Sequence, residues 1–256
     1  MSQKNLNSSP LVITTMVLLL CACGGPRINN KPAVDKSEDP LDVFADAHVI
    51  VSLDKILVRN NPTAWVKDAN WDEYLLTIRA QAGSGEIVLQ SVHIEDKMGE
   101  WHGHEESRKA LNRSTRVLKK KYKKAGYKVK LGQGSTHASV TGVSIALGSG
   151  YLAGAVTATG SIGTLTSVGV GVAVAVPALV ISGMTKLVYN TKVNNRIQAR
   201  KTILPLTVSQ SGSAVDLFFP AVPLPQLLVI EYTHNEQPHQ ITFDLNRVTT
   251  GLHIKK

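Results

Sequence analysis

The longest uncharged stretch of the chain limits what it can fold into more than any other feature. From Leu131 to Thr185 there is no Asp, Glu, Lys or Arg over 55 residues, and eleven of the chain's 20 glycines lie there. Residues 138–158 and 165–188 are each long enough to cross about 30 Å of hydrocarbon as a helix, with TGSIG at 159–163 as the turn between them. The stretch predicts a Gly-rich hydrophobic hairpin over residues 131–190 that contacts or crosses a membrane.

Small residues recur at every fourth position in the first half of this hairpin. Gly142, Ala146, Gly150 and Gly154 form the stripe, and the last two make a GxxxG pattern. Such a stripe lets two helices approach closely, so Gly142, Gly150 and Gly154 are predicted to pack the hairpin. In composition the segment is similar to the glycine-zipper membrane domains of several envelope lipoproteins. The similarity covers roughly 50 residues and carries over no active-site positions.

The second half of the hairpin also contains a pattern that favours strands. Five valines from Val168 to Val176 alternate with Gly or Ala, which is the period of a strand. Pro177 would kink a helix at this point. A β-hairpin inserted by oligomerisation and a hairpin buried in the protein core therefore stay open beside the helical membrane hairpin.

The N-terminus has the layout of an export signal over residues 1–22. A polar start precedes the uncharged run Leu11–Leu20, whose ten residues rise about 15 Å as a helix, half the thickness of a bilayer core. The sequence LCACG at 20–24 follows and resembles the lipobox of bacterial lipoproteins. The resemblance implies that signal peptidase II cleaves between Ala22 and Cys23, and that Cys23 carries a diacylglyceryl group and an N-terminal fatty acid such as palmitate. An ordinary signal peptide or a signal anchor with chance cysteines is the alternative.

The two cysteines and the residue after them indicate the compartment. Cys21 would leave with the signal and no cysteine follows Cys23, so the mature chain has one thiol, the lipid site, and no disulfide. Position 24 is Gly, whereas Asp at this position retains lipoproteins in the inner membrane of enteric bacteria. The resemblance therefore implies the outer membrane of a Gram-negative bacterium, with the domain facing the periplasm. Outer membranes seldom accept isolated helices, so this location conflicts with a helical hairpin.

Residues 23–44 contain three prolines, mixed charges and few apolar side chains. This composition predicts a flexible tether. About twenty such residues reach on the order of 25 Å, enough to hold a domain clear of the lipid headgroups.

Strand patterns occupy residues 45–100 and 191–256, on either side of the insertion. In residues 74–81 one face carries Tyr, Leu, Ile and Ala, in the alternation of a half-buried strand. The break AGSG at 82–85 then predicts a hairpin into residues 86–95.

A second hairpin is predicted from residues 227–233 and 239–245 around the polar turn 234–238. Neither set of three or four strands is stable alone, but together they supply the seven or eight strands of a small sandwich. We therefore expect a mainly β chain with a helical insertion (α+β). Its architecture would be an immunoglobulin-like antiparallel β-sandwich, interrupted by a basic amphipathic helix and the hydrophobic hairpin. Trp65 and Trp71 would cover one end of the core, with a ligand platform as the alternative.

Residues 101–130 are the basic part of the insertion. Ser107–Lys130 contains eleven Lys and Arg and no acidic residue, which exceeds the net charge of +9 of the whole chain, so the basicity is local. Gly126 is a plausible end of the helix. One apolar stripe of a helix runs through this segment: Leu111, Leu118, Tyr122 and Ala125.

The cations of this helix are predicted to contact anionic lipid, because the hydrophobic stretch follows directly and each cation near a membrane contributes roughly 1 kcal/mol. The residues are Arg116, Lys119, Lys120, Lys121, Lys123 and Lys124. A solvated helix face is the alternative. Nucleic acid is not expected as a partner, because an exported lipoprotein rarely meets it.

Signals of catalysis are weak in this chain. His102 and His104, with a carboxylate from the adjacent Glu105-Glu106, offer three ligands for zinc or copper, and a solvated loop is the alternative. The chain has no G-x-S-x-G or Walker motif, and the G-x-G-x-x-A at 148–153 lacks the βαβ context of a dinucleotide site. We therefore expect no enzyme and no cofactor.

These observations favour a non-enzymatic envelope lipoprotein anchored by its N-terminal lipid. Its β-sandwich would bind an envelope protein partner or a second copy of the chain, while the hairpin contacts or crosses the membrane. The alternative function is an oligomeric pore or membrane-perturbing protein that uses residues 131–185.

Overall fold

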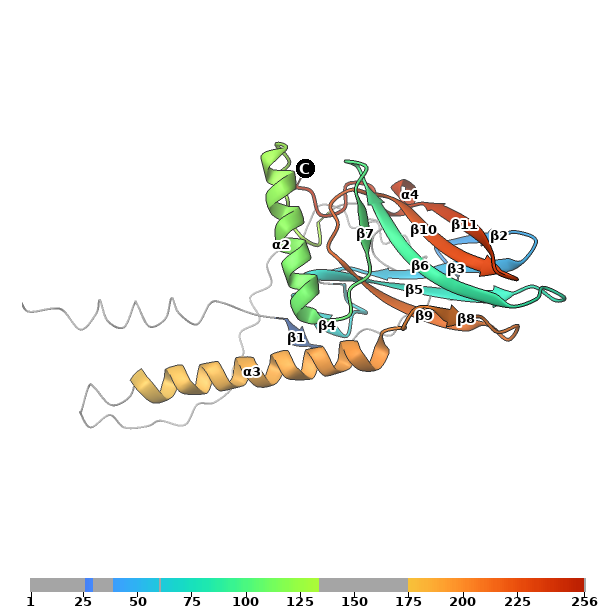
Figure 1. The fold of residues 1–256 in the computed structure, drawn as a ribbon. Coiled ribbons are helices and arrows are strands. Elements are labelled where there is room, and N and C mark those ends of the chain that lie inside the picture. Colours follow the sequence, from blue (N-terminus) through green and yellow to red (C-terminus); the bar gives the residue numbers. More distant parts are fainter. Residues whose placement is uncertain (1–25, 30–38, 60, 134–174, 256) are drawn as a thin grey trace, which may run out of the picture.

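The computed structural model describes residues 26–29, 39–59, 61–133 and 175–255, and the side chains of the second long helix from residue 188 onward. Within these residues the chain is mainly β, with several antiparallel sheets and few helices (Figure 1). This is the β-rich α+β class that the sequence predicts.

The first sheet has four strands in the order β2-β3-β5-β9, each antiparallel to its neighbours. They are β2 (Asp42–Ala45), β3 (Val49–Leu57), β5 (Trp71–Ala80) and β9 (Ser213–Pro220). Alternate side chains are buried along the first half of β3 and the second half of β5, as the period of two predicts. The sheet therefore turns one apolar face towards the second sheet.

The second sheet has the order β11-β10-β6-β7, and the short β8 pairs with the start of β6. Its strands are β6 (Ile87–Asp96), β7 (Trp101–Gly103), β8 (Leu206–Thr207), β10 (Pro225–His234) and β11 (Gln237–Asp244). The hairpin predicted from residues 227–245 is confirmed, because β10 and β11 pair around Asn235 and Glu236. Both turn residues have positive φ, the conformation of a type I′ turn.

The inner faces of the two sheets enclose one core. Tyr74 of β5 and Phe219 of β9 meet edge to face in it, with ring centroids 5.2 Å apart. β5 pairs with β9, and β6 pairs with β10, so each sheet joins a strand before the insertion to a strand after it. We call the two sheets and this core the β unit.

The predicted hairpin between residues 74–81 and 86–95 is wrong. β5 pairs with β3 and β9 in the first sheet, whereas β6 pairs with β7, β8 and β10 in the second. The Gly-rich break therefore carries the chain from one sheet to the other. Two alternating strands joined by such a break fit either arrangement, because each strand buries one face in both cases.

The structure differs from the predicted tether, 23–44, at both ends that it describes. β1 (Arg27–Ile28) pairs with β4 (Val66–Lys67), and β2 adds an edge strand to the first sheet. Phe44 of β2 meets Phe243 of β11 edge to face, with centroids 6.4 Å apart. Apolar side chains at both ends of the Pro-rich segment therefore dock it on the rest of the protein.

α2 (Arg108–Lys124) is the predicted basic helix. Ser107 caps its N-terminus by accepting a hydrogen bond from the backbone N–H of Ala110 (3.2 Å). Gly126 follows its C-terminus with a φ of +88°, the conformation that favours glycine there. The buried side chains lie on one stripe: Leu111, Thr115, Leu118 and Tyr122. Ala125, which the sequence placed in the stripe, is exposed at the C-cap.

α3 (Ala175–Arg200) is the second long helix and begins inside the predicted hairpin. Residues 191–200, which the sequence assigned to the second half of the sandwich, are part of it. The physical reason is local, because Val193 and Ile197 lie one turn apart and are both fully buried.

Pro177 lies in the first turn of α3, where a missing backbone N–H costs no intrahelical hydrogen bond. Among the helices of the described residues, none is both long and apolar enough to cross a membrane. A last short helix, α4 (Asn246–Thr249), follows β11.

Candidate functional site at the helix end

A second apolar core lies at one end of the β unit, where β5 begins and β9 ends. α2 and α3 cover this end, and β1 contacts α3 (Figure 1). The core side chains come from the β4 region, β5, β9 and both helices: Trp65, Val66, Ala69, Trp71, Leu111, Val193, Ile197 and Phe218. The prediction that two tryptophans cover an end of the β core is confirmed. We call this part of the molecule the helix end.

Thr115 fixes α2 to the helix end. Its hydroxyl donates to the backbone oxygen of Asn70 (2.6 Å) and accepts from the backbone N–H of Ala221 (2.9 Å). These two partners directly precede β5 and directly follow β9. A single buried hydroxyl therefore satisfies two backbone groups at strand ends and sets where α2 lies on them.

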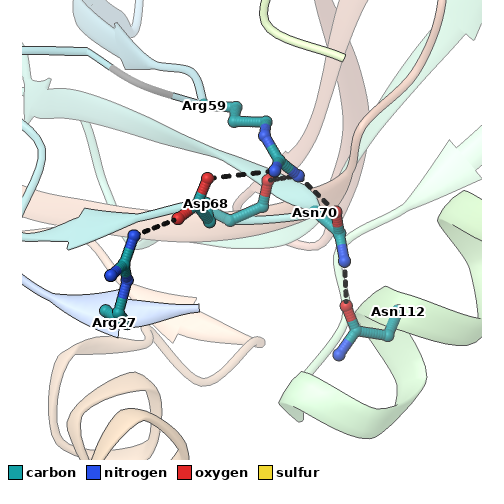
Figure 2. A network of polar contacts seen from close by, with 6 residues as sticks. Arg27, Arg59, Asp68, Asn70 and Asn112 are labelled. Carbon is teal, nitrogen blue, oxygen red and sulfur yellow. Dashed lines mark hydrogen bonds and ion pairs between the residues drawn. The ribbon is translucent and has the colours of Figure 1, made fainter. Parts of the chain in front are cut away.

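A chain of polar contacts connects β1 to α2 across the helix end (Figure 2). Asp68 accepts hydrogen bonds from Arg27 of β1 (3.2 Å) and from Arg59 (3.1 Å). Arg59 also donates to the side-chain oxygen of Asn70 (2.8 Å), whose amide nitrogen donates to Asn112 of α2 (3.0 Å). One network therefore ties the first described strand to the first long helix.

The uncharged stretch leaves the described residues, after residue 133, beside the same network. Gly132 has a φ of +75°, and a Cβ placed on it would lie 2.6 Å from the backbone oxygen of Arg59. Its N–H donates to Nδ1 of the buried His253 (2.9 Å), whose Nε2 lies 2.7 Å from a carboxylate oxygen of Asp72. Because Nδ1 accepts, the proton on Nε2 is donated to Asp72, and this segment is held against β5.

Arg200, the last residue of α3, holds that helix on the β unit. Its guanidinium pairs with Glu73 of β5 and with Asp216 of β9 (2.9 Å). Glu73 also accepts the indole N–H of Trp65 (2.7 Å). Arg196 and Arg200 lie over the ring of Trp65, 5.1 and 5.9 Å from its centroid. The carboxylate of Glu73, only 3% exposed, therefore joins α3 to the tryptophan core.

Burial and the neighbouring carboxylate of Glu73 raise the pKa of Asp216 to about 8, against the opposing effect of Arg200. One oxygen of Asp216 is buried and receives no hydrogen bond from the described residues. A carboxyl group in such surroundings keeps its proton. The raised pKa therefore favours the protonated form of Asp216 near neutral pH.

Three segments that the sequence connects with lipid enter the helix end. Cys23 precedes Arg27 of β1 by four residues, which span at most about 14 Å. The uncharged stretch leaves beside Arg59, as described above, and returns through α3, which contacts β1 and α2. The first half of α3 extends beyond the β unit (Figure 1). The predicted lipidation site and both ends of the uncharged stretch are therefore connected to one end of the molecule.

The six cations predicted to contact lipid differ in exposure. Lys119 and Lys121 are half-buried, and Lys121 pairs with Glu100. The exposed ones are Arg116, Lys120, Lys123 and Lys124. Large apolar side chains are exposed on the neighbouring elements as well: Trp101, Val117, Val188 and Tyr189. Cations mixed with exposed aromatic and aliphatic side chains are typical of a surface that lies at a membrane interface.

A groove of about 510 Å³ separates β7 from α2. Trp101 and His102 of β7 line it on one side, and Arg113, Val117 and Lys121 of α2 line it on the other. Trp101 is 53% exposed and Val117 is 60% exposed. The groove therefore offers apolar surface between charged groups, and Trp and Arg are the side chains that contribute most to protein interfaces.

His102 belongs to a group of potential metal ligands different from the one that the sequence predicts. Its Nε2 lies 2.9 Å from Asp96, and Glu100 completes three ligand atoms within 4.8 Å of one another. Asp96 already accepts the backbone N–H groups of Met98 (2.8 Å) and Glu100 (3.0 Å), while Glu100 pairs with Lys121. Both carboxylates therefore hold the turn between β6 and β7 and the adjoining helix.

His104 is not part of that group. Its ring meets Phe219 edge to face with centroids 6.4 Å apart, and burial lowers its pKa below the ordinary value of histidine. Of the two carboxylates predicted to offer a third ligand, Glu105 accepts a hydrogen bond from Ser114 of α2 (2.8 Å) and Glu106 pairs with Lys201 (2.6 Å). The structure does not bring His102, His104 and Glu105 together as one ligand set.

The remaining predicted sites lie outside the described residues. They are the cleavage site Ala22–Cys23, the lipidation site Cys23, the packing residues Gly142, Gly150 and Gly154, and the alternating valines from Val168 to Val174. Comparison of the chain with protein-family models, with curated proteins and with solved structures finds no match.

Sequence patterns do not predict the residues that close the helix end. Glu73 and Arg200 are 127 residues apart in the chain, and Asp72 and His253 are 181 residues apart. Each is a single titratable residue without a local motif, so only the tertiary fold, which places the end of α3 and the segment after α4 against β5, brings the partners together. The adjacent Asp72 and Glu73 at the start of a largely apolar strand are the one local signal, because buried carboxylates require partners.

Arg200→Met is expected to lower the free energy of unfolding by about 3–5 kcal/mol, because it leaves the buried Glu73 without its cation. Arg196→Met is the matched control, since Arg196 also stacks on Trp65 but has no ion pair among the described residues, and it is expected to cost less than about 1 kcal/mol. Urea unfolding of the full chain in detergent, followed by tryptophan fluorescence, measures both. Equal losses would contradict the role of the ion cluster.

The raised pKa of Asp216 predicts how stability changes with pH. The folded protein keeps a proton that the unfolded chain, with the ordinary pKa of 3.8, has lost, so the free energy of unfolding falls between pH 5 and pH 8. Asp216→Asn retains the shape of the protonated group. It is expected to make this fall smaller by at least about 1.4 kcal/mol, the equivalent of one pKa unit. Urea unfolding at several pH values tests this, and parallel curves for both proteins would sink it.

Proposed function

We propose that this chain is a non-enzymatic, lipid-anchored envelope protein of a Gram-negative bacterium whose helix end faces the membrane. The observation that carries the proposal is the meeting of three segments at that end. They are β1, which follows Cys23, and the two ends of the uncharged stretch. Cys23 in its lipobox-like sequence supplies the anchor, and the proposed location is the outer membrane facing the periplasm.

The pairing of β1 sets how far the helix end lies from the lipid. A free tether over residues 23–44 would reach on the order of 25 Å. Because Arg27 is already paired with Lys67, only the residues from Cys23 to Arg27 remain, and they span at most about 14 Å. The anchor therefore keeps the helix end close to the headgroups.

The exposed face of α2 suits this position. Arg116, Lys120, Lys123 and Lys124 are exposed on it, and Val117 lies among them with 60% of its surface exposed. Each cation close to an anionic surface contributes roughly 1 kcal/mol before screening, and the Debye length is about 8 Å at physiological ionic strength. Only a helix held at the surface gains this energy, which is what the short connection to Cys23 provides.

We also propose that residues 131–190, which include the first half of α3, contact or cross the membrane. The first half of α3 extends beyond the β unit (Figure 1), and Val188 and Tyr189 are about half exposed where its described side chains begin. Tyrosine is enriched at the boundary between lipid and water. The cluster around Arg200 holds the other end of α3 on the β unit. A movement of the hairpin would therefore be transmitted through α3 to β5 and β9.

The β unit is proposed to be an immunoglobulin-like sandwich. In that fold one sheet has the strand order A-B-E-D and the other has G-F-C, with C′ beside C in the variable type. If β3, β5 and β9 are taken as A, B and E, and β6, β7, β10 and β11 as C, C′, F and G, the strand orders A-B-E and G-F-C-C′ follow. β2 is then an extra edge strand, and the helical insertion stands where strand D would be.

The groove between β7 and α2 supports the partner-binding part of the proposal. An exposed Trp101 and an Arg113 lie in it beside Val117, the types of side chain that anchor protein interfaces. The proposed partner is another envelope protein or a second copy of this chain. The groove lies against the helix that faces the lipid, so a partner bound there would also be close to the membrane.

Replacement of the two cysteines tests the lipid anchor. Cys23→Ala is expected to leave the signal uncleaved and the chain without acyl groups, because the lipobox-like sequence would lack its modified residue. Cys21→Ala, two residues earlier, is the matched control and should be processed as the wild type is. The mass of the chain in the envelope fraction gives the result. A Cys23→Ala chain of the same mature, acylated mass as the wild type would overturn the anchor.

The same substitution separates the anchor from the hairpin. The Cys23→Ala chain is exported with a cleavable non-lipid signal, and the envelope is washed with alkaline carbonate and then urea. Retention in the pellet without aggregation is expected, because residues 131–190 hold the chain in lipid. Complete release would contradict a membrane-crossing hairpin and leave the lipid as the only anchor. Conductance of planar bilayers by the retained chain would favour the pore alternative.

A further inference from the structure

Three histidines meet at the end of the β unit that lies away from α2 and α3. His48 is in the connection between β2 and β3, and His234 and His239 are on β10 and β11 on either side of their turn. Figure 1 shows both connections at that end. β5 runs from the helix end to the histidine end. It starts at Trp71 in the helix end, and Gln81, directly after its last residue, donates its N–H to the backbone oxygen of His48 (2.8 Å). Ten residues of strand separate the two ends by about 33 Å.

Strand register places two of these histidines on one face. His239 of β11 is paired directly with Tyr232 of β10, and His234 follows Tyr232 by two residues. Side chains two residues apart in a strand, and side chains directly opposite in a pair, point to the same side of the sheet. Because Tyr232 is buried between the sheets, His234 and His239 also point towards the first sheet, where His48 lies.

The three imidazoles come close enough to bind one ion. Their ring centroids are 3.9 Å apart for His48 and His234, 5.0 Å for His48 and His239, and 6.0 Å for His234 and His239. One nitrogen from each ring lies within 4.8 Å of the other two. Three nitrogens that bind a tetrahedral ion at about 2.0 Å are about 3.3 Å apart. The rings of His48 and His234 are stacked, with 23° between their planes, so His234 must rotate about its side-chain torsions to turn a nitrogen towards a shared ion, and its partial exposure leaves room for this.

The surroundings hold two of the rings in place. The hydroxyl of Tyr232 donates to the carboxylate of Asp46 (2.5 Å), and the ring of Tyr232 stacks on His239 with centroids 5.1 Å apart. Asp46 also accepts the backbone N–H groups of His48 and Val49, both at 2.8 Å. One tyrosine thus braces the ring from the second sheet and the turn that carries the ring from the first.

We propose that His48, His234 and His239 form a binding site for one divalent transition-metal ion, with Zn²⁺ as the reference ion. Imidazole donors select Zn²⁺, Cu²⁺ and Ni²⁺ over Ca²⁺ and Mg²⁺, which prefer oxygen. Three histidines leave a fourth coordination position for water or for a ligand atom of another molecule. The inference does not rest on the proposed membrane function, because these residues lie at the opposite end of the β unit.

The group of Asp96, Glu100 and His102 is the competing site, and its chemistry is weaker. Both of its carboxylates already bind backbone N–H groups or Lys121, and a metal would have to displace those contacts. The three histidines have no such ion pairs with cations among the described residues. One titration therefore decides between the two groups.

The test is Zn²⁺ binding to the full chain, purified in detergent without a polyhistidine tag. Equilibrium dialysis is expected to give one Zn²⁺ per chain with a Kd below about 1 µM. His234→Ala/His239→Ala is expected to weaken binding by more than roughly 100-fold, because it removes two ligands, whereas loss of an outer-shell group alone costs about 10–100-fold. The matched control, His102→Ala/His104→Ala, should bind as the wild type does, and no variant should bind Ca²⁺.

Three results would overturn the proposal. They are no Zn²⁺ uptake by the wild type at about 100 µM, uptake that survives His234→Ala/His239→Ala, and uptake that is lost in the control instead. The thermal unfolding midpoint without metal shows whether the double variant is folded. If that midpoint falls, His48→Gln on the other sheet takes its place with the same expected loss. X-ray absorption of the wild type should then show three nitrogen ligands at about 2.0 Å, and fewer than three would reject the ligand set.

Discussion

The cluster of Arg200 and Asp216 around the buried carboxylate of Glu73 is the interaction on which the rest of the structure depends. The insertion separates β7 from β8 by about a hundred residues, and the chain must return to the same core for β9 and β10 to complete both sheets. Arg200 marks that return, because it ends α3 and pairs with one carboxyl group on β5 and one on β9. Glu73 also binds Trp65, so the ion cluster and the tryptophan core share a residue. A buried charge that loses its partner lowers the free energy of unfolding by about 3–5 kcal/mol, so the contact of Arg200 with Glu73 strongly favours the folded arrangement of α3 on the β unit.

The molecule has two chemically different ends, and the ion cluster around Glu73 lies at one of them. At the helix end, cations and exposed apolar side chains of α2 and α3 surround the points where the chain connects to Cys23 and to the uncharged stretch. At the other end, three imidazoles from both sheets lie beside an ionised Asp46. A domain held to a membrane by the first end presents the second end to the aqueous compartment, roughly 33 Å away along β5. Any ion or ligand bound there would be reached from solution and not from the lipid.

Local patterns in the sequence predicted a good part of this structure. The alternation around Tyr74, the hairpin of β10 and β11, and the stripe of Leu111, Leu118 and Tyr122 depend on neighbours within a few residues, and each is found in the structure. The predicted hairpin of β5 and β6 failed because turn chemistry does not say which sheet the next strand joins. The length of the tether was overestimated, because Ile28 packs on the core of the helix end and Phe44 packs on Phe243, and these contacts hold both described ends of the Pro-rich segment. The histidine cluster was missed because His48 and His234 are 186 residues apart and only the stacking of two sheets brings them together.

The central claim is that the helix end, and not the histidine end, lies against the membrane. In the proposed mature chain Cys23 is the single cysteine and carries the lipid, so a cysteine introduced elsewhere could be labelled alone. The most direct measurement compares a fluorophore at Lys120→Cys with one at Glu236→Cys, both in vesicles that contain anionic lipid and a lipid-bound quencher. Lys120 is on the exposed face of α2 and Glu236 is in the turn beside His234. The account predicts strong quenching at position 120 and none at position 236. Equal quenching at both positions, or quenching at position 236 alone, would contradict it.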